Sequence, residues 1–452
     1  MKKASLLNDY LNRYAAGLHW KLQAGNLENI EQVVVIPAYA EKDLIFATLA
    51  SIAANDERYL ETTLILCVVN NKADASADVK ENNAQTLKLL DALTSKQPIS
   101  KFNLAADLHV SLQMIADRPL RLGFMDASSS GLEIPPRAGG VGMARKIGMD
   151  MALRLLQNSG KPRLILSLDA DTLVQSDYLS AVRSVFLSGK AQIGIIAYEH
   201  QMPLDKIERA AICYYEIFLR YWVLGLKYAQ SPYAFYSIGS TIVTTADSYL
   251  AVRGMNRREA GEDFYFLNKL AKTGSISQIS ATRVYPSARI SARVPFGTGA
   301  AVEKIVSGAG QEQRLYDPRI FIILKEWIAL MKQSFNCSEH QIIAKARDID
   351  SGLASFLVAR GFLAVWPKIR RNLNDEKTCE RHFHGWFDGF ETLKLINDLS
   401  KTLYPRISLV SALNKILEML NWDYPGGLPA EDFPAPEDEM RILRYLRNMA
   451  NR

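Results

Sequence analysis

Residues 164–172, LILSLDADT, constrain the fold of this chain more than any other segment. Four of the first five residues are large and apolar, which is typical of a short strand buried in a sheet. Asp169 and Asp171 follow at once, with one small residue between them. In an open α/β sheet, ligands bind beyond the carboxyl ends of the strands. The segment therefore predicts a strand that carries two carboxylates into a ligand crevice, where both could reach one Mg²⁺ or Mn²⁺ ion. The alternative is a strand that ends in a solvated turn, because D-x-D is common by chance.

Other apolar segments predict further strands, and helical segments separate them. Strands are predicted at residues 32–36, 63–69, 108–115 and 193–197, and helices at residues 42–55, 77–93 and 143–156. Residues 118–140, rich in Ser, Gly and Pro, are predicted as a long loop. Strands that alternate with helices indicate right-handed βαβ units and a mostly parallel sheet.

The pattern becomes helical from about residue 318 to the end of the chain. A chain of 452 residues is too long for one ordinary core. We therefore predict a helical extension at residues 1–30, an α/β domain at 31–300 and an all-α domain at 301–452. The aromatic segment 204–228 is interpreted as a core helix, with an interfacial helix near a lipid-linked acceptor as the alternative.

The net charge and the cysteine content limit the expected partners and location of the protein. The net charge of +6 suits anionic substrates or an acidic membrane surface, and no arginine-rich block predicts nucleic-acid binding. The four cysteines are scattered without a C-x-x-C motif, which favours a reducing compartment. We recognise neither a signal peptide nor a transmembrane helix. The expected location is the cytoplasm, with peripheral contact at the inner face of the membrane as a further option.

The first strand ends in IPAYAE, residues 36–41. Pro37 is expected to end the strand and turn the chain across the carboxyl edge of the sheet. Tyr39 could then stack on a base, and Glu41 could accept a hydrogen bond from a ribose or a base. The alternative is a plain turn in which Glu41 favours the start of the next helix.

Two helix starts also carry charged residues. In GGVGMARKIGMD, residues 139–150, the glycines permit close approach to phosphate. Arg145 and Lys146 follow early in that helix, where a bound diphosphate would offset an unfavourable position for cations. They could instead be solvated. In GEDFYFLNKL, residues 261–270, Glu262 and Asp263 could be helix-capping residues or include a general base.

Taken together, these motifs resemble the family 2 glycosyltransferases, which have the GT-A fold, over about residues 30–290. VVVIPAYAE, VGMARKIGMDMAL, ILSLDADT and the run from SIGSTIVTT to GEDFYFLNKL stand in the order of that family. ARKIG, whose arginine lies 24 residues before Asp169, is close to the ARNxG of the family.

The resemblance implies roles for individual residues. Asp169 and Asp171 match the motif that holds Mn²⁺ or Mg²⁺ against the diphosphate of a nucleotide-sugar donor. Asp263 matches the base that deprotonates an acceptor hydroxyl, and Glu262 beside it would help to shape the acceptor site. The remaining matches, to positions around the nucleotide, the phosphates and the donor sugar, are Pro37, Tyr39, Glu41, Arg145, Gly239 and Ser240. The implied reaction inverts the anomeric carbon and delivers the sugar to a glycan or lipid-linked acceptor.

The sequence departs from the family at the second strand. That strand usually ends in an acidic residue that contacts the base, but here it ends in Asn70-Asn71-Lys72. Asn70 could still bind a base edge. Outside the motifs, His382 and His384 could supply a third metal ligand or could serve local packing. Arg289 and the run 293–299 could belong to a loop that closes over phosphates or to an interdomain linker.

Two other functions are also compatible with parts of this pattern. A nucleotidyltransferase that makes a nucleotide sugar would share this fold, but it typically has a glycine-rich loop and a lysine after the first strand, where this chain has PAYAE. A catalytically silent binding relative would not need Asp169, Asp171 and Asp263 together.

Overall fold

The computed structural model describes residues 2–136, 139–158, 162–290, 297–307, 314–373, 375–431 and 434–449. The chain divides into two compact units. The first contains Met1–Gln201 and Ser237–Ala300, and the second contains Met202–Tyr236 and Ala301–Arg452. The segment 202–236, which the sequence pattern places inside the α/β domain, thus lies in the second unit.

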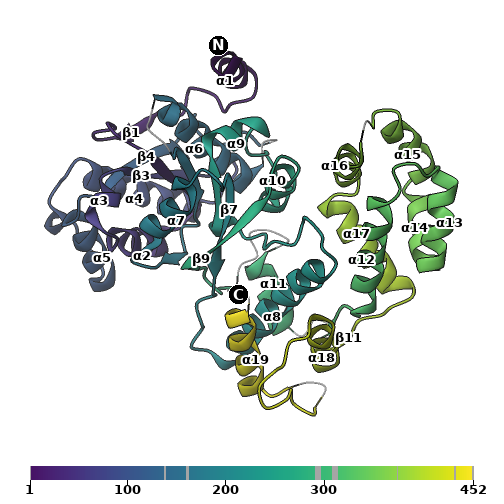
Figure 1. Cartoon of the computed structure of the whole chain (residues 1–452). Helices are drawn as coiled ribbons and strands as arrows, with labels where there is room; N and C mark the ends of the chain where they lie inside the picture. Colours follow the sequence, from purple (N-terminus) through teal and green to yellow (C-terminus); the bar gives the residue numbers. More distant parts are fainter. Residues whose placement is uncertain are drawn as a thin grey trace. The chain divides into compact units, whose positions relative to one another are not determined.

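A nine-stranded sheet, counted over the described residues, forms the centre of the first unit (Figure 1). Its strands, in spatial order, are β1 (Leu22–Ala24), β4 (Arg121–Ala127), β3 (Thr63–Asn70), β2 (Gln32–Ala38), β5 (Leu164–Ser167), β8 (Ile242–Thr245), β7 (Ile193–Tyr198), β9 (Ile276–Tyr285) and β6 (Leu173–Val174). Strands β2, β3, β4, β5, β7 and β9 run in one direction, and β1, β6 and β8 run antiparallel to their neighbours. The predicted α/β class with a mostly parallel sheet is confirmed.

Helices connect these strands. They are α2 (Lys42–Ala53), α3 (Glu57–Leu60), α4 (Ala77–Thr94), α5 (Ala106–Ala116), α6 (Gly140–Leu155), α7 (Tyr178–Leu187), α9 (Ala246–Ala251) and α10 (Glu262–Ala271). Helix α6 packs on β2, β3 and β5, and Gly148 permits this close approach. A Cβ atom at Gly148 would lie 2.4 Å from Cγ1 of Val35. The sheet therefore fixes the position of the helix that carries Arg145.

The prediction of a strand at residues 108–115 is wrong. These residues belong to α5, and their burial follows a helical period. Leu112 and Ile115 are buried, whereas Val110 and Met114 are exposed. The neighbouring strand β4 instead lies within the predicted loop 118–140. Strand β9 was not predicted, because its sequence ISQISATRVY is largely polar.

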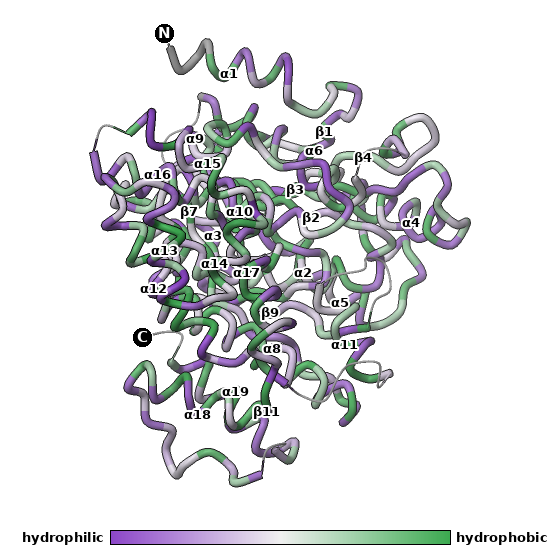
Figure 2. The backbone as a smooth tube through the Cα atoms, turned by 90° about the vertical axis from the view of Figure 1, so that its right-hand side faces the viewer, coloured by the Kyte–Doolittle hydropathy of each residue, from purple (hydrophilic) through white to green (hydrophobic). Residues whose placement is uncertain are grey.

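Helix α1 (Lys2–Arg13) is held against α6 by a buried polar network. Figure 2 shows hydrophilic and hydrophobic residues alternating along α1, as in an amphipathic helix. The Tyr10 hydroxyl donates to Oδ1 of Asp150 at 2.5 Å, and Nζ of Lys146 lies 3.0 Å from Oδ2 of the same carboxylate. The Tyr249 hydroxyl also donates to Asp150, at 2.7 Å. Since all four side chains are buried, the network is a fixed part of the first unit.

The second unit is helical apart from a two-stranded ladder between β10 (Arg314–Leu315) and β11 (Ile407–Ser408), within the described residues. Its helices are α8 (Lys206–Tyr228), α12 (Arg319–Lys332), α13 (Glu339–Ile349), α14 (Ser351–Ala359), α15 (Phe362–Arg370), α16 (Glu376–Trp386), α17 (Gly389–Thr402), α18 (Leu409–Leu420) and α19 (Pro436–Met449), while α11 (Thr298–Val306) spans the division between the units. Trp327 lies at the core, with its ring edge-on to Phe362 and Phe383. Buried Glu216 of α8 accepts hydrogen bonds from Arg447 of α19, which ties the last helix to this core.

Across the described ranges, no single helix is long and apolar enough to span a bilayer. One bent pair, α14 and α15, meets the length and composition criteria when taken together, with a 76° angle between the helices.

Candidate active site

The predicted motifs converge at one edge of the sheet. Parallel neighbours β2, β3 and β5 end there at Ala38, Asn70 and Ser167. Antiparallel β8 begins at the same edge, directly after the turn Gly239–Thr241. The sheet topology therefore gathers side chains that are far apart in the sequence, such as Glu41 and Arg289, which are separated by 248 positions.

Arg145 on α6 lies at the centre of this cluster, with 3% of its side chain exposed. Nε donates to Oε1 of Glu262 at 3.0 Å, and Nη1 donates to Oγ of Ser167 at 2.5 Å. Nη2 forms an ion pair with Oδ1 of Asp169. Burial lowers the pKa of Arg145, but the carboxylates of Asp169 and Glu262 outweigh it and raise the pKa above its usual value. A buried guanidinium therefore joins the D-x-D motif to the start of α10.

The turn before β8 is shaped around this guanidinium. A Cβ atom at Gly239 would lie 2.2 Å from Nη2 of Arg145, so a larger residue would displace the arginine. The hydroxyl of buried Ser240 donates to Oδ2 of Asp169 at 2.5 Å and lies 2.9 Å from the hydroxyl of Thr172. Gly239 and Ser240 thus hold Arg145 and Asp169 in place.

Asp171 faces a different cation. Its Oδ2 atom lies 3.0 Å from Nη2 of Arg289, and the same nitrogen pairs with Oε1 of Glu41. Burial, followed by the nearby carboxylate of Asp169, raises the pKa of Asp171 to about 7, although Arg289 opposes the shift. Gln201 donates to the backbone carbonyl of Asp171 at 3.0 Å, which fixes this turn against the end of β9.

Asp263 occupies the first turn of α10. The helix begins after Gly261, whose φ of 66° is left-handed. Burial and the carboxylate of Glu262 raise the pKa of Asp263 to about 7. A carboxylate with a pKa near 7 is suited to general base catalysis at neutral pH. Glu262 itself is buried against Arg145, so in this structure it positions the arginine.

The first-strand motif differs in detail from its prediction. Pro37 does not end the strand, because β2 continues to Ala38 and Pro37 lies opposite Val68 of β3. Tyr39 follows and is half-buried. Nδ2 of buried Asn70 donates to the carbonyls of Ala38 at 3.0 Å and Val68 at 3.2 Å. Asn70 therefore ties the two strand ends together, and its contact with a base stays a prediction.

Lys146, His382 and His384 have other surroundings. Lys146 belongs to the buried network around Asp150, so its charge is compensated there. His382 and His384 lie on α16 in the second unit. Burial lowers the pKa of His384 to about 4, and its ring packs on Phe383, with ring centroids 4.8 Å apart. The surroundings of His384 correspond to a role in local packing, the alternative to a role as a metal ligand.

The charges at the sheet edge fit a divalent cation. The groups are the carboxylates of Glu41, Asp169, Asp171, Glu262 and Asp263 and the guanidinium groups of Arg145 and Arg289. Among the described residues, no three His, Cys, Asp or Glu side chains are grouped closely enough to hold a metal without other ligands. Mg²⁺ in proteins usually takes one or two carboxylates and completes its shell with phosphate oxygens and water. The side chains of Asp169 and Asp171 are 32% and 20% exposed, and two partly exposed carboxylates fit that mode of binding.

We expect Asp263 to make the unliganded protein less stable as the pH rises from about 4 to about 7. An unfolded Asp titrates near pH 3.9, so between these values the folded state binds more protons than the unfolded state. The groups that act on Asp263 are Glu262, Asp169, Arg145 and the backbone of Phe264. Unfolding free energies measured in chelator across this range should fall less steeply in Asp263→Asn than in the wild type. Equal slopes would show that Asp263 is already ionised at low pH.

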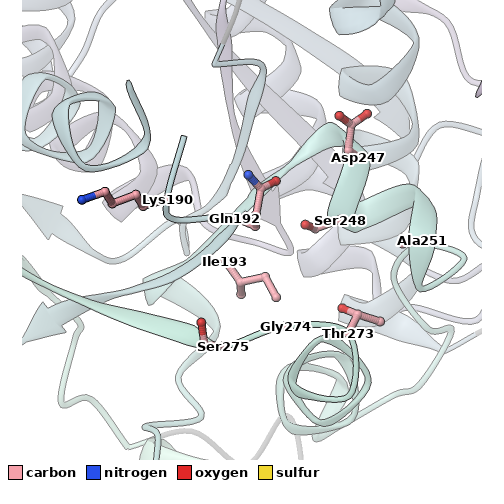
Figure 3. A pocket seen from close by; sticks show the side chains of 9 residues that line it. All are labelled: Lys190, Gln192, Ile193, Asp247, Ser248, Ala251, Thr273, Gly274 and Ser275. Carbon is pink, nitrogen blue, oxygen red and sulfur yellow. The ribbon is translucent and has the colours of Figure 1, made fainter. Parts of the chain in front are cut away.

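A separate cleft of about 290 Å³ lies at the other edge of the sheet (Figure 3). It adjoins Ile193 at the start of β7 and Asp247 and Ser248 just after the end of β8. The lining also includes Lys190 and Ser275 and contains none of the predicted site residues. The acidic edge is therefore the better candidate for chemistry.

Fold and site together define an α/β protein with an arginine-centred acidic cluster at the carboxyl edge of its sheet. No family model and no curated protein sequence matches the chain. Among solved structures, the chain is similar to S. aureus TarS 1–349 in complex with UDP-GlcNAc, with 13% identity and a TM-score of 0.37 over 93% of this chain and 89% of that chain. It is also similar to mannosyltransferase PcManGT from Pyrobaculum calidifontis in complex with GDP-Man and Mn²⁺, with 13% identity and a TM-score of 0.35 over 89% of this chain and 94% of that chain. Both TM-scores are low, so the site is interpreted from its own residues.

Sequence reasoning missed two contributors to the site. Ser167 accepts a hydrogen bond from Arg145, and its signal was the single polar residue in the apolar run LILSL. Thr172 contacts Ser240 from the end of the same segment. The sequence offered no sign that Arg289 would contact Asp171, because the two residues are far apart and only the sheet brings them together.

Proposed function

We propose that this chain is a glycosyltransferase that moves a sugar from a nucleotide-diphosphate donor to an acceptor hydroxyl. The observation that carries the proposal is the Arg145 cluster. It places Asp169 of the acidic pair and Glu262, the neighbour of Asp263, on one buried guanidinium. One guanidinium would thus hold the residues assigned to the leaving group, next to Asp169, at a fixed distance from Asp263, which is assigned to the proton.

The proposed mechanism assigns the proton to Asp263. Its carboxylate takes the proton from the acceptor hydroxyl as the oxygen attacks the anomeric carbon, and the nucleoside diphosphate leaves from the opposite face. This single displacement inverts the anomeric configuration. Asp263 suits the task because its raised pKa lies near neutral pH.

The other residues bind and orient. Asp171, with Asp169 beside it, would hold Mn²⁺ or Mg²⁺, and the ion would neutralise charge on the departing diphosphate. Arg145 has protein partners at Nε, Nη1 and Nη2, so it acts by orienting Asp169 and Glu262. Tyr39 and Glu41 follow the end of β2, and we assign the nucleotide to this end of the strand.

The acceptor and the setting are proposals of the same kind. We infer a glycan or lipid-linked acceptor, a cytoplasmic location and membership of family 2 with its GT-A fold. Exposed Leu204 and Ile207 beside Lys206 at the start of α8 support peripheral contact with a membrane surface. A nucleotidyltransferase is less well supported, since PAYAE stands where that class has a glycine-rich loop and a lysine.

A panel of UDP-, GDP- and dTDP-sugars tests the proposal. With Mn²⁺ present, at least one donor should raise the melting temperature and be hydrolysed slowly. A donor at a hundred times its Kd would stabilise the fold by about 2.7 kcal/mol. Asp247→Asn, at the opposite edge of the sheet, should respond as the wild type does. If no member of the panel binds or is turned over, the chain is not a glycosyltransferase of this kind.

A further inference from the structure

Arg289 lies between two carboxylates of the proposed donor site. It follows β9, and its Nη2 atom contacts both Asp171, at 3.0 Å, and Glu41. These two carboxylates come from the loops after β5 and β2, so one guanidinium bridges separate parts of the sheet edge. The guanidinium of Arg289 therefore lies beside the carboxylates where, in the proposed function, a divalent metal ion would bind together with the donor.

Hydrogen bonds hold the backbone around this bridge, whereas the Arg289 side chain is partly exposed. The amide of Arg289 donates to Oγ of Ser287 at 3.2 Å, and Ala288 between them is buried. Gln201 joins the carbonyls of Asp171 and Tyr285, which fixes the distance between the two chain segments. The Arg289 side chain is 33% exposed, compared with 20% for Asp171 and 8% for Glu41. The arginine is therefore the most exposed of the three side chains in this bridge.

The local charges also favour an exchange of partners. Arg145 pairs with Asp169 and Glu262, whereas Arg289, among the described residues, is a cation that contacts both Glu41 and Asp171. A diphosphate entering beside three carboxylates would be repelled unless positive charge came with it or turned toward it. A planar guanidinium binds two phosphate oxygens as readily as it binds a carboxylate.

We propose that Arg289 exchanges partners when the donor binds. Its guanidinium group then releases Asp171 and Glu41 and binds the diphosphate instead. This inference rests on the proposed function and adds a regulatory step to the same site. Without nucleotide, Arg289 neutralises Asp171 and excludes free divalent cations. With nucleotide, Arg289 binds phosphate oxygens and Asp171 becomes available as a metal ligand. Metal and donor consequently bind together, in a coupled manner.

Manganese binding without nucleotide tests this exchange directly. Full-length wild type and Arg289→Gln are titrated with Mn²⁺ alone, and free Mn²⁺ is followed by electron paramagnetic resonance. The variant should bind Mn²⁺ about ten- to a hundredfold more tightly, the factor that corresponds to releasing a hydrogen bond between charged groups. Arg283→Gln is the matched control. Arg283 lies on β9, and its side chain pairs with Glu199 at 2.9 Å, away from Asp171 and Glu41. It should bind Mn²⁺ as the wild type does.

A second titration, with UDP and GDP in chelator, reports on the phosphate contact. Arg289→Gln should bind the nucleoside diphosphate about tenfold or more weakly than wild type. Arg289→Lys keeps the charge without the planar fork and should give intermediate values in both titrations, which preserves the test if the glutamine variant folds poorly. Equal Mn²⁺ affinities in wild type and both variants would overturn the exchange. A wild type that binds none of UDP, GDP and dTDP, with or without Mn²⁺, would overturn the proposed function, while the Mn²⁺ comparison would still decide the role of Arg289 toward Asp171.

Discussion

Replacing Asp263 by Asn should lower kcat for sugar transfer by about 10²–10⁴, the usual contribution of a positioned general base. Asparagine has nearly the same shape, so α10 and the neighbouring Glu262–Arg145 pair should stay in place. The loss should lie in kcat because the carboxylate is needed only when the acceptor proton leaves. Steady-state kinetics with the donor identified from the panel measures the effect.

The pH profile provides the control for this variant. Wild-type kcat should rise as the pH approaches 7 and then level off, because Asp263 must be deprotonated to act as the base. Asp263→Asn should lack that rise. A variant that keeps wild-type kcat, or keeps the same limb of the pH profile, would assign the proton to another group.

Replacing Arg145 by Met should destabilise the first unit by about 3–5 kcal/mol, as removal of one partner from a buried ion pair does. The substitution leaves Glu262, which is 5% exposed, without its cation and also removes the partner of Asp169. Sugar transfer should be lost as well, because both sides of the site depend on this side chain. Chemical denaturation gives the free energy of unfolding.

Two comparisons isolate the cause. Arg163→Met removes a partly exposed ion pair with Asp247 and should cost less than about 1 kcal/mol. Adding Glu262→Gln to Arg145→Met removes one of the unpaired charges and should restore part of the stability. If Arg145→Met and Arg163→Met had the same free energy of unfolding, the buried Arg145 cluster would contribute no more to stability than a partly exposed ion pair.

The strands were predicted correctly where burial on both faces of the sheet requires a continuous run of apolar residues. Strands β2, β3 and β5 are buried on both faces, so their apolar runs were found within a residue or two, and Asp169 and Asp171 stood where expected after β5. Failures occurred where a pattern admits two periods. The segment 108–115 matches alternation and also a helical spacing, and only the burial of Leu112 and Ile115 decides for the helix.

The site was predicted as a set of motifs, but its connections were not. The resemblance of ARKIG to the family motif singled out Arg145, but the charges alone do not distinguish Arg145, which points into the acidic cluster, from Lys146, which points toward Asp150 on another face of α6. Adjacent residues on a helix point in different directions, and which direction meets a carboxylate depends on the packing of α6 against the sheet. For the same reason the sequence could not show that Asp169 and Asp171 have different arginine partners.

The central claim is a division of labour between Asp171, on the leaving-group side, and Asp263, which receives the proton. Calorimetric titration of Asp171→Asn and Asp263→Asn with the donor, in the presence of Mn²⁺, tests it most directly. Asp263→Asn should bind the donor with wild-type affinity, and Asp171→Asn should bind it at least about tenfold more weakly. The opposite result, with donor binding lost in Asp263→Asn and retained in Asp171→Asn, would contradict the account.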